Sequence, residues 1–230
     1  MELRPFRAIR FSPEAFPDAA IRIAELTQPG QDPAAASVRL KEWMDGGILW
    51  KERRPGMWQY VQTEERAGTP RVVRMLVGVV RVEPKGDVVI TGPEEDPSEE
   101  RRGLLGGLRA DFEPALVATR APLTAALMTT RRPDHTVADG GRRHDLLRIT
   151  DYAEHVELQG LVKNAEATLR DGRAGWDAAR ALSQDPAAAK LPGAKYKLCA
   201  IVEENELADR PEPLRLAAGF FGFSVEDPVY

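Results

Sequence analysis

Apolar runs alternate with turn-forming residues along much of the chain, which predicts a series of β-strands. Residues 3–11 alternate apolar and basic side chains and favour an extended segment lying across a sheet. Further strands are expected at 48–50, 57–62, 72–82, 88–90, 115–118, 136–149 (two strands about a turn at Asp139-Gly140-Gly141) and 196–202. Gly and Pro between the runs from 48 to 90 predict an antiparallel meander. Since 72–82 is apolar on both faces apart from two arginines, it should be the central strand.

Helical spacing and capping residues predict four helices, near 33–45, 97–108, 152–170 and 175–184. Asp32-Pro33 supplies an N-cap acid followed by a proline that suits the first turn. Asp151, with Glu154 three residues later, has the form of a capping box. The two patterns together predict a mixed α/β fold, with a largely antiparallel sheet and flanking helices. We expect one continuous unit over 1–230, the alternative being a division into 1–130 and 131–230.

Composition narrows the class of protein. The chain has 230 residues, 43% of them apolar, enough to bury a core. A net charge of -4 argues against binding to nucleic acids or anionic membranes, and no apolar run is long enough to cross a bilayer. The single cysteine, Cys199, lies in an apolar run and is expected to be a core thiol. Without a disulfide framework or a signal peptide, the sequence predicts a soluble cytoplasmic protein.

Residues 171–179 carry the clearest chemical signal. Asp171-Gly172 favours a tight turn, and an alanine-rich helical pattern follows, so backbone N–H groups would face any bound anion. Gly172, Arg173 and Asp177 are therefore candidate ligand-binding residues. Asp171 is a candidate catalytic residue that could contact a hydroxyl or a metal, although Asp before Gly more often holds the turn through its own side chain.

Four segments in this order resemble the domain-of-unknown-function 1015 family: 4–11, the Glu94 segment with Arg101-Arg102, 139–151, and 171–179. The likeness covers most of the chain but only the first half to two-thirds of a typical member. It implies an α/β protein whose turn is similar to that of the ParB and sulfiredoxin-like superfamily. Some members of that superfamily bind nucleotides, and some phosphorylate free serine.

The chain departs from the family pattern at three places. The turn reads Asp-Gly-Arg-Ala-Gly where the family has Asp-Gly-His-His-Arg, so both histidines and the arginine are missing. The family's His-Glu pair is replaced by Pro93-Glu94, which keeps only the carboxylate. The Pro-Pro-Tyr-Asp motif that usually follows the first strand is absent. Because imidazoles are the groups that would move a proton in phosphoryl transfer, these changes weigh against catalysis.

Other candidate residues have a structural alternative. Arg7 and Arg10 could clamp a phosphate, or they could form the solvent face of an amphipathic strand. Glu94 could be a general base, or one acid of a solvated charge run. No histidine has metal-ligand spacing, so we expect no metal site, and His144 is predicted to be exposed. Trp176 is expected to pack against Leu169 or Leu182.

The sequence and the family resemblance leave two candidate functions. The favoured one is a non-catalytic binding or regulatory protein with a residual anion- or nucleotide-binding turn. The alternative is a nucleotide-dependent kinase acting on free serine, with ATP or ADP and Mg²⁺ as cofactors. The apolar tail 214–223 should be buried, either in the core or against another chain. A homodimer or a complex with a full-length relative is expected on that ground.

Overall fold

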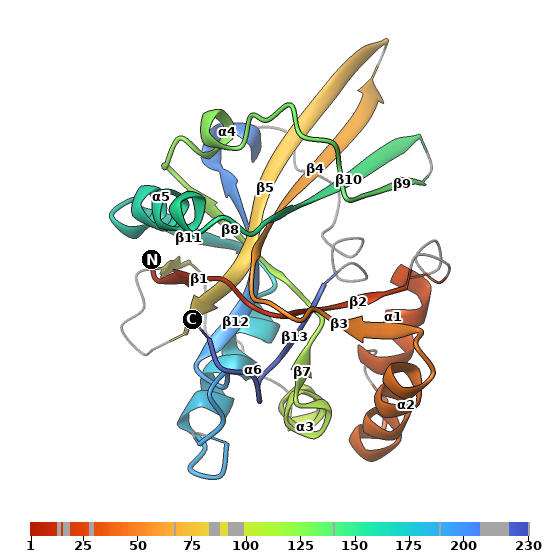
Figure 1. The fold of residues 1–230 in the computed structure, drawn as a ribbon. Coiled ribbons are helices and arrows are strands. Elements are labelled where there is room, and N and C mark those ends of the chain that lie inside the picture. Colours follow the sequence, from red (N-terminus) through yellow and green to blue (C-terminus); the bar gives the residue numbers. More distant parts are fainter. Residues whose placement is uncertain are drawn as a thin grey trace.

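The structure is a computed structural model that describes residues 1–12, 15, 19–27, 30–66, 68–82, 88–91, 99–139, 141–188, 190–207 and 221–229. In this part of the chain, two β-sheets are flanked by six α-helices, which confirms the mixed α/β fold (Figure 1). Both sheets are open. The predicted residues Pro93 and Glu94 lie outside the described part of the chain, as does Gly140 of the predicted hairpin turn.

The large sheet has nine strands in the order β6-β11-β8-β12-β5-β4-β10-β9, with β1 also paired to β5. Their bounds are β1 (Leu3–Arg4), β4 (Met57–Arg66), β5 (Thr69–Arg81), β6 (Val88–Ile90), β8 (Ala115–Thr119), β9 (His135–Asp139), β10 (Arg142–Ile149), β11 (Ala167–Asp171) and β12 (Tyr196–Glu203). Among these, β6 with β11 and β8 with β12 are parallel pairs, and the other pairs are antiparallel. The sheet is therefore largely antiparallel, as expected.

Strand β5 is central, as its apolar sequence predicts. It pairs with β12 along one edge and with β4 and then β1 along the other, and it is buried from Met75 to Val80.

The predicted meander is wrong outside the β4–β5 hairpin. The run at 48–50 joins the second sheet, and β6 pairs with β11. Gly and Pro mark where strands end, but long-range packing decides which strands become neighbours.

The small sheet contains β2 (Ala8–Phe11), β3 (Leu49–Lys51), β7 (Ala110–Asp111) and β13 (Gly222–Ser224), in the order β3-β2-β13-β7. The alternating segment 3–11 is shared between the sheets, because β1 belongs to the large one and β2 to the small one. A bridge between Phe6 and Gly56 holds the crossing point. The small sheet thus combines strands from the beginning, the middle and the end of the sequence.

The helices are α1 (Ala19–Thr27), α2 (Pro33–Asp45), α3 (Glu99–Leu108), α4 (Leu123–Ala126), α5 (Tyr152–Lys163) and α6 (Arg173–Gln184), followed by the 3₁₀ turn η2 (Glu204–Leu207). Asp32 and Asp151 cap α2 and α5 through their carboxylates, as predicted.

The predicted helix 152–170 is wrong after residue 163. Ala167 and Leu169 alternate with Thr168 and Arg170, and this period of two forms strand β11 between β6 and β8.

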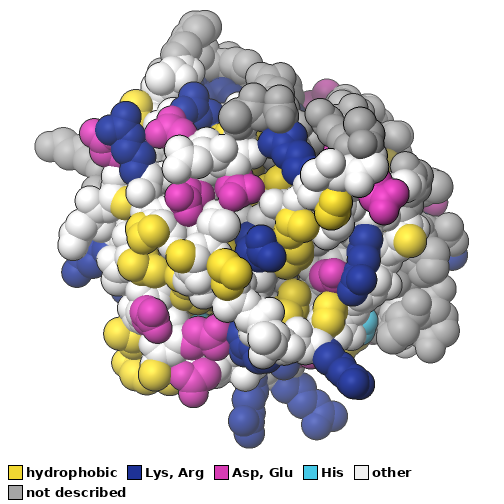
Figure 2. All heavy atoms as spheres, turned by 90° about the horizontal axis from the view of Figure 1, so that it is seen from above, with side chains coloured by type: hydrophobic (Ala, Val, Ile, Leu, Met, Phe, Trp, Pro, Cys, Tyr) yellow, Lys and Arg dark blue, Asp and Glu magenta, His cyan; other side chains and the backbone are white. Residues whose placement is uncertain are grey.

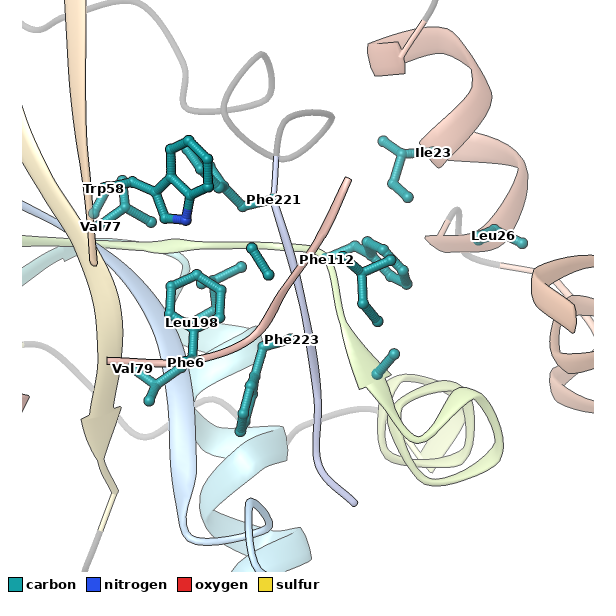
Figure 3. Packing of buried hydrophobic residues seen from close by; sticks show 14 of the residues in the cluster. Phe6, Ile23, Leu26, Trp58, Val77, Val79, Phe112, Leu198, Phe221 and Phe223 are labelled. Atoms are coloured by element: carbon teal, nitrogen blue, oxygen red, sulfur yellow. The ribbon is translucent and has the colours of Figure 1, made fainter. Parts of the chain in front are cut away.

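Two hydrophobic clusters occupy the interior. One fills the space between the two sheets and α1, α2 and α3, with Phe6, Trp58, Phe221 and Phe223 at its centre (Figure 3). The other contains buried residues of α4, α5 and α6, with Trp176 and Leu169 in the same cluster. Cys199 is fully buried, as expected, and burial raises the pKa of its thiol.

His144 corrects a further expectation, because it is fully buried and not exposed. Its ring lies parallel to that of Tyr60, and its Nδ1 is 2.7 Å from the Tyr60 hydroxyl. The charged neighbours Arg143 and Asp145 suggested a solvent-facing segment, but successive strand residues point to opposite faces. His144 therefore shares its face with buried Leu146. Burial also raises the pKa of Tyr60.

The described part of the apolar tail is core. Phe221 and Phe223 are buried, and residues 214–220 lie outside the described part of the chain. Phe223 sits in β13 between β2 and β7, and its ring meets Phe6 edge-on with centroids 6.1 Å apart. A strand in the middle of a sheet cannot be removed without exposing both neighbours.

We predict that Phe223→Ala lowers the free energy of unfolding by about 3–5 kcal/mol, because it leaves a cavity in the core. Urea denaturation followed by circular dichroism measures the change. Met128→Ala is the matched control, since this side chain is exposed and its loss should change stability by only about 0.5 kcal/mol. Equal effects of the two substitutions would contradict the core role of β13.

Candidate functional site

The Asp171 turn lies where β11 ends and α6 begins. Gly172 is the N-cap of α6 and has a φ of 80°, a conformation that favours glycine. The turn also leaves no room for a side chain, because a Cβ at Gly172 would lie 3.0 Å from the Ala115 Cα. Asp171 accepts a hydrogen bond from the Gly172 N–H through Oδ1 at 2.7 Å, so it holds the turn. No side chain caps α6.

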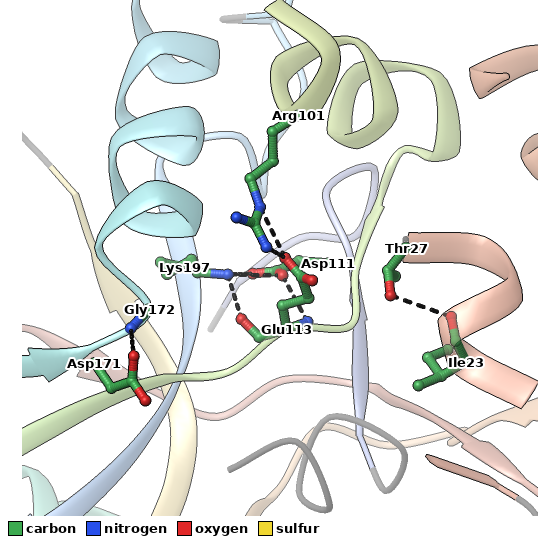
Figure 4. Close-up of polar contacts among 8 residues, drawn as sticks. All are labelled: Ile23, Thr27, Arg101, Asp111, Glu113, Asp171, Gly172 and Lys197. Carbon is green, nitrogen blue, oxygen red and sulfur yellow. Dashed lines mark hydrogen bonds and ion pairs between the residues drawn. The ribbon is translucent and has the colours of Figure 1, made fainter. Parts of the chain in front are cut away.

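The first turn of α6 faces Lys197, which extends from β12. At Gly175 the helix presents bare backbone: a Cβ there would be 3.3 Å from Lys197 Nζ and 4.0 Å from Glu113 Oε2. Figure 4 shows Lys197 reaching from beside the Asp171–Gly172 turn toward Asp111 and Glu113. The turn singled out in the sequence thus lies next to a charged cluster.

Lys197 and Asp111 form a buried ion pair. The Lys197 Nζ donates to both Asp111 carboxylate oxygens at 2.8 Å and to the Glu113 carbonyl at 2.5 Å. Asp111 Oδ2 also accepts the Leu198 N–H at 3.1 Å. Each charged group makes several hydrogen bonds. These bonds offset the free-energy cost of removing both groups from water, which is the condition for a buried ion pair to be tolerated.

A small cavity opens beside this pair. It is lined by Thr27 of α1, by Arg101, Leu104, Leu105 and Leu108 of α3, by residues 110–113, by Gly175 and Ala178 of α6, and by Lys197. Arg101 and Glu113 are each about a third exposed, and Arg101 donates two hydrogen bonds to Glu113 Oε2, at 2.7 and 3.1 Å. The cavity therefore has an apolar wall on α3 and a charged wall in which cations and anions are balanced.

The structure separates the residues that the sequence grouped as ligand-binding. Asp171 and Gly172 precede the first turn of α6, whose Gly175 lines the cavity. Arg173 lies along the helix and pairs with Asp177, whose side chain is buried. Arg7 and Arg10 bind Glu52 and Asp227 in a different part of the fold. Of the two alternatives for Arg10, the solvent face of a strand is wrong, since only 4% of the residue is exposed. It enters the space between the two sheets, where Trp58 covers it.

Sequence reasoning missed the four charged residues of the site: Arg101, Asp111, Glu113 and Lys197. Lys197 offered a signal, because it stands at the start of an otherwise apolar strand, where an unpaired charge would be unstable. Its partner could not be identified, since Asp111 lies 86 positions earlier in the sequence.

The described residues contain no group of three or more His, Cys, Asp or Glu side chains that could hold a metal ion. No helix within them is long and apolar enough to cross a membrane. On the face shown in Figure 2, basic and acidic side chains are interspersed with hydrophobic ones.

Comparisons with known proteins support the resemblance seen in the sequence. A search of curated proteins and a search of solved structures found no match to the chain. A family model described as a protein of unknown function, DUF1015, matches residues 21–208. The matched region includes the Asp171 turn and the charged residues around Lys197, and excludes Arg7 and Arg10. Because this match covers most of the sequence, the chain belongs to the DUF1015 family.

Proposed function

We propose that this protein is a non-catalytic binding protein that holds a small molecule bearing an anionic group in the cavity beside α6. The observation that carries the proposal is the uncapped first turn of α6, which meets Lys197 at Gly175 across the cavity wall. Backbone N–H groups at a helix N-terminus favour anions. Arg101 adds a partly exposed guanidinium that can exchange its contact with Glu113 for one with the ligand.

The ligand that fits is small and partly apolar. Leu104, Leu105 and Leu108 of α3 would contact its apolar part, while Arg101 and the helix N-terminus would contact its charged group. Because Lys197 is already bonded to three oxygens, it acts on the ligand mainly as a fixed positive charge beside α6. Regulation would follow if ligand binding fixes α3 against α6, since the two helices pack together beside the cavity.

Phosphoryl transfer is the second candidate, with ATP or ADP and Mg²⁺ as cofactors and Glu94 and Asp171 as the candidate acids. We place it second because the acids at the cavity are engaged: Asp111 with Lys197, and Glu113 with Arg101. Arg173 and Ala174 stand where the family turn has imidazoles, and an arginine cannot act as a base near neutral pH.

Association with a second copy or with a longer relative is also a proposal. Phe221 and Phe223 cannot provide the surface, since both are buried in the core. Tyr152 and Val156 are better placed, because they lie one turn apart on the exposed side of α5.

We predict that a compound bound in the cavity raises the melting temperature of the wild-type protein. Thermal-shift measurements with phosphate, nucleotides and amino acids identify it, and a ligand at a hundred times its Kd adds about 2.7 kcal/mol of stability. Gly175→Ala should weaken the response, because the new methyl group would lie 3.3 Å from Lys197 Nζ.

The matched control for this experiment is Gly160→Ala in α5, where a Cβ meets no atom within 4 Å. Both substitutions replace a helical glycine, so their effects on helix propensity are similar. If Gly175→Ala and Gly160→Ala bind the ligand equally well, the cavity beside α6 is not the binding site.

We also predict that the purified protein does not phosphorylate free serine with ATP or ADP and Mg²⁺. Mass spectrometry of the reaction mixture detects phosphoserine. The physical reason is the missing imidazoles together with the paired acids of the cavity. Turnover that survives Asp171→Ala but is lost in Glu94→Ala would instead identify a kinase and assign Glu94 as its base.

A further inference from the structure

A second charged cluster lies between the two sheets, around Glu52. The Arg10 guanidinium sits between two indole rings, 4.8 Å from the centroid of Trp50 and 4.3 Å from that of Trp58. Its Nη2 donates to Glu52 Oε1 at 2.7 Å, and Arg148 Nη1 is 3.0 Å from Glu52 Oε2. We call Arg10, Glu52, Trp58 and Arg148 the Glu52 cluster. It shares no residue with the cavity beside α6.

Three N–H groups of the Glu52 cluster are buried without an acceptor: Nε of Arg10, Nε of Arg148 and Nε1 of Trp58. Arg10 is 4% exposed and Trp58 is 1% exposed. A buried donor without a partner costs about 1–3 kcal/mol, so native structures seldom keep several of them together. Such donors indicate a place where oxygen atoms of a ligand would be stabilised.

The charges around these donors also favour a ligand with negatively charged oxygen atoms. Two guanidiniums share the single carboxylate of Glu52, which leaves one positive charge uncompensated within the cluster. Arg7 adds a third guanidinium beside it, because its Nε donates to the Glu52 backbone carbonyl at 3.0 Å. Asp227 pairs with Lys51 at 2.9 Å and with Arg7 at 3.9 Å, so its one negative charge is shared by two cations outside the Glu52 cluster. The Asp134 carboxylate accepts the backbone N–H of Arg148, but Asp134 is exposed.

We infer that the Glu52 cluster binds an oxyanion, a carboxylate or phosphate group whose oxygens accept from Arg10, Arg148 and Trp58. Guanidinium groups with an indole N–H are suited to such a group, because they are donors only and bring positive charge. Glu52 keeps the two arginines apart and oriented. This site is separate from the one that the proposed function uses.

Trp50 controls access to the Glu52 cluster. Its ring covers Arg10 and is 39% exposed, and one hydrogen bond of 3.3 Å from its Nε1 to the Phe11 carbonyl holds it in place. Arg7 and Arg148 form the rim, with side chains 34% and 23% exposed. An oxyanion reaches Arg10 when the Trp50 ring turns aside, so binding should change the tryptophan fluorescence.

The test titrates the 230-residue protein with sodium phosphate and sodium acetate, against sodium chloride at equal ionic strength. Melting temperature and tryptophan fluorescence are both recorded. We expect phosphate or acetate to raise the melting temperature above the chloride value and to change the fluorescence. Trp58→Phe removes one donor but keeps most of the packing, and it should weaken the apparent affinity about tenfold. Arg10→Lys should weaken it at least as much.

Three controls make the outcome decisive. Arg53→Gln removes an exposed arginine near the cluster and should leave the response unchanged. Gly175→Ala should leave the Trp50-dependent fluorescence change unchanged, which separates this site from the cavity beside α6. Trp50→Phe should reduce the fluorescence change but keep the thermal response. If phosphate and acetate act no differently from chloride, or act as strongly on Trp58→Phe and Arg10→Lys as on the wild-type protein, the inference is wrong and water satisfies these donors.

Discussion

The ion pair between Lys197 and Asp111 joins the two sheets of this protein. Lys197 belongs to β12, next to the central strand of the large sheet, and Asp111 belongs to β7 at the edge of the small one. The same carboxylate binds the Leu198 N–H, and the same ammonium binds the Glu113 carbonyl. Removing either partner would leave a buried charge unpaired, which typically costs about 3–5 kcal/mol. Helix α6 packs against β12 beside this pair, and its Gly175 leaves room for the lysine.

Features determined by neighbouring residues could be predicted from the sequence. Asp32 and Asp151 cap their helices because an N-cap needs only a short side chain and the next few backbone N–H groups. The apolar character of β5 placed it at the centre of the sheet, since both of its faces are covered. The Asp171–Gly172 turn was recognisable because a positive φ at residue 172 favours glycine.

Features determined by distant residues could not be predicted. The apolar residues of the segment from 152 to 170, among them Leu161, Val162 and Leu169, fit one long helix as well as a helix followed by a strand. Only the pairing of Leu169 with β6 and β8 decides between the two assignments. Arg10 and His144 look like surface residues in sequence, yet each is buried against a partner more than 40 positions away. The candidate site has the same origin, because its charged residues come from α3, β12 and the segment around β7.

The order of strands in the small sheet has a consequence for biosynthesis. Strand β13 lies between β2 and β7, so the sheet cannot close until residue 224 has left the ribosome. Until then β2 and β7 each lack a neighbour, and Asp111 at the end of β7 is joined to the large sheet by its contacts with Lys197 and Leu198. Contacts that join distant parts of a sequence form slowly, because a long loop must close before they stabilise the chain. A nascent chain would therefore expose the edges of β2 and β7 until β13 is made, and unpaired edges of this kind can pair with strands of other chains.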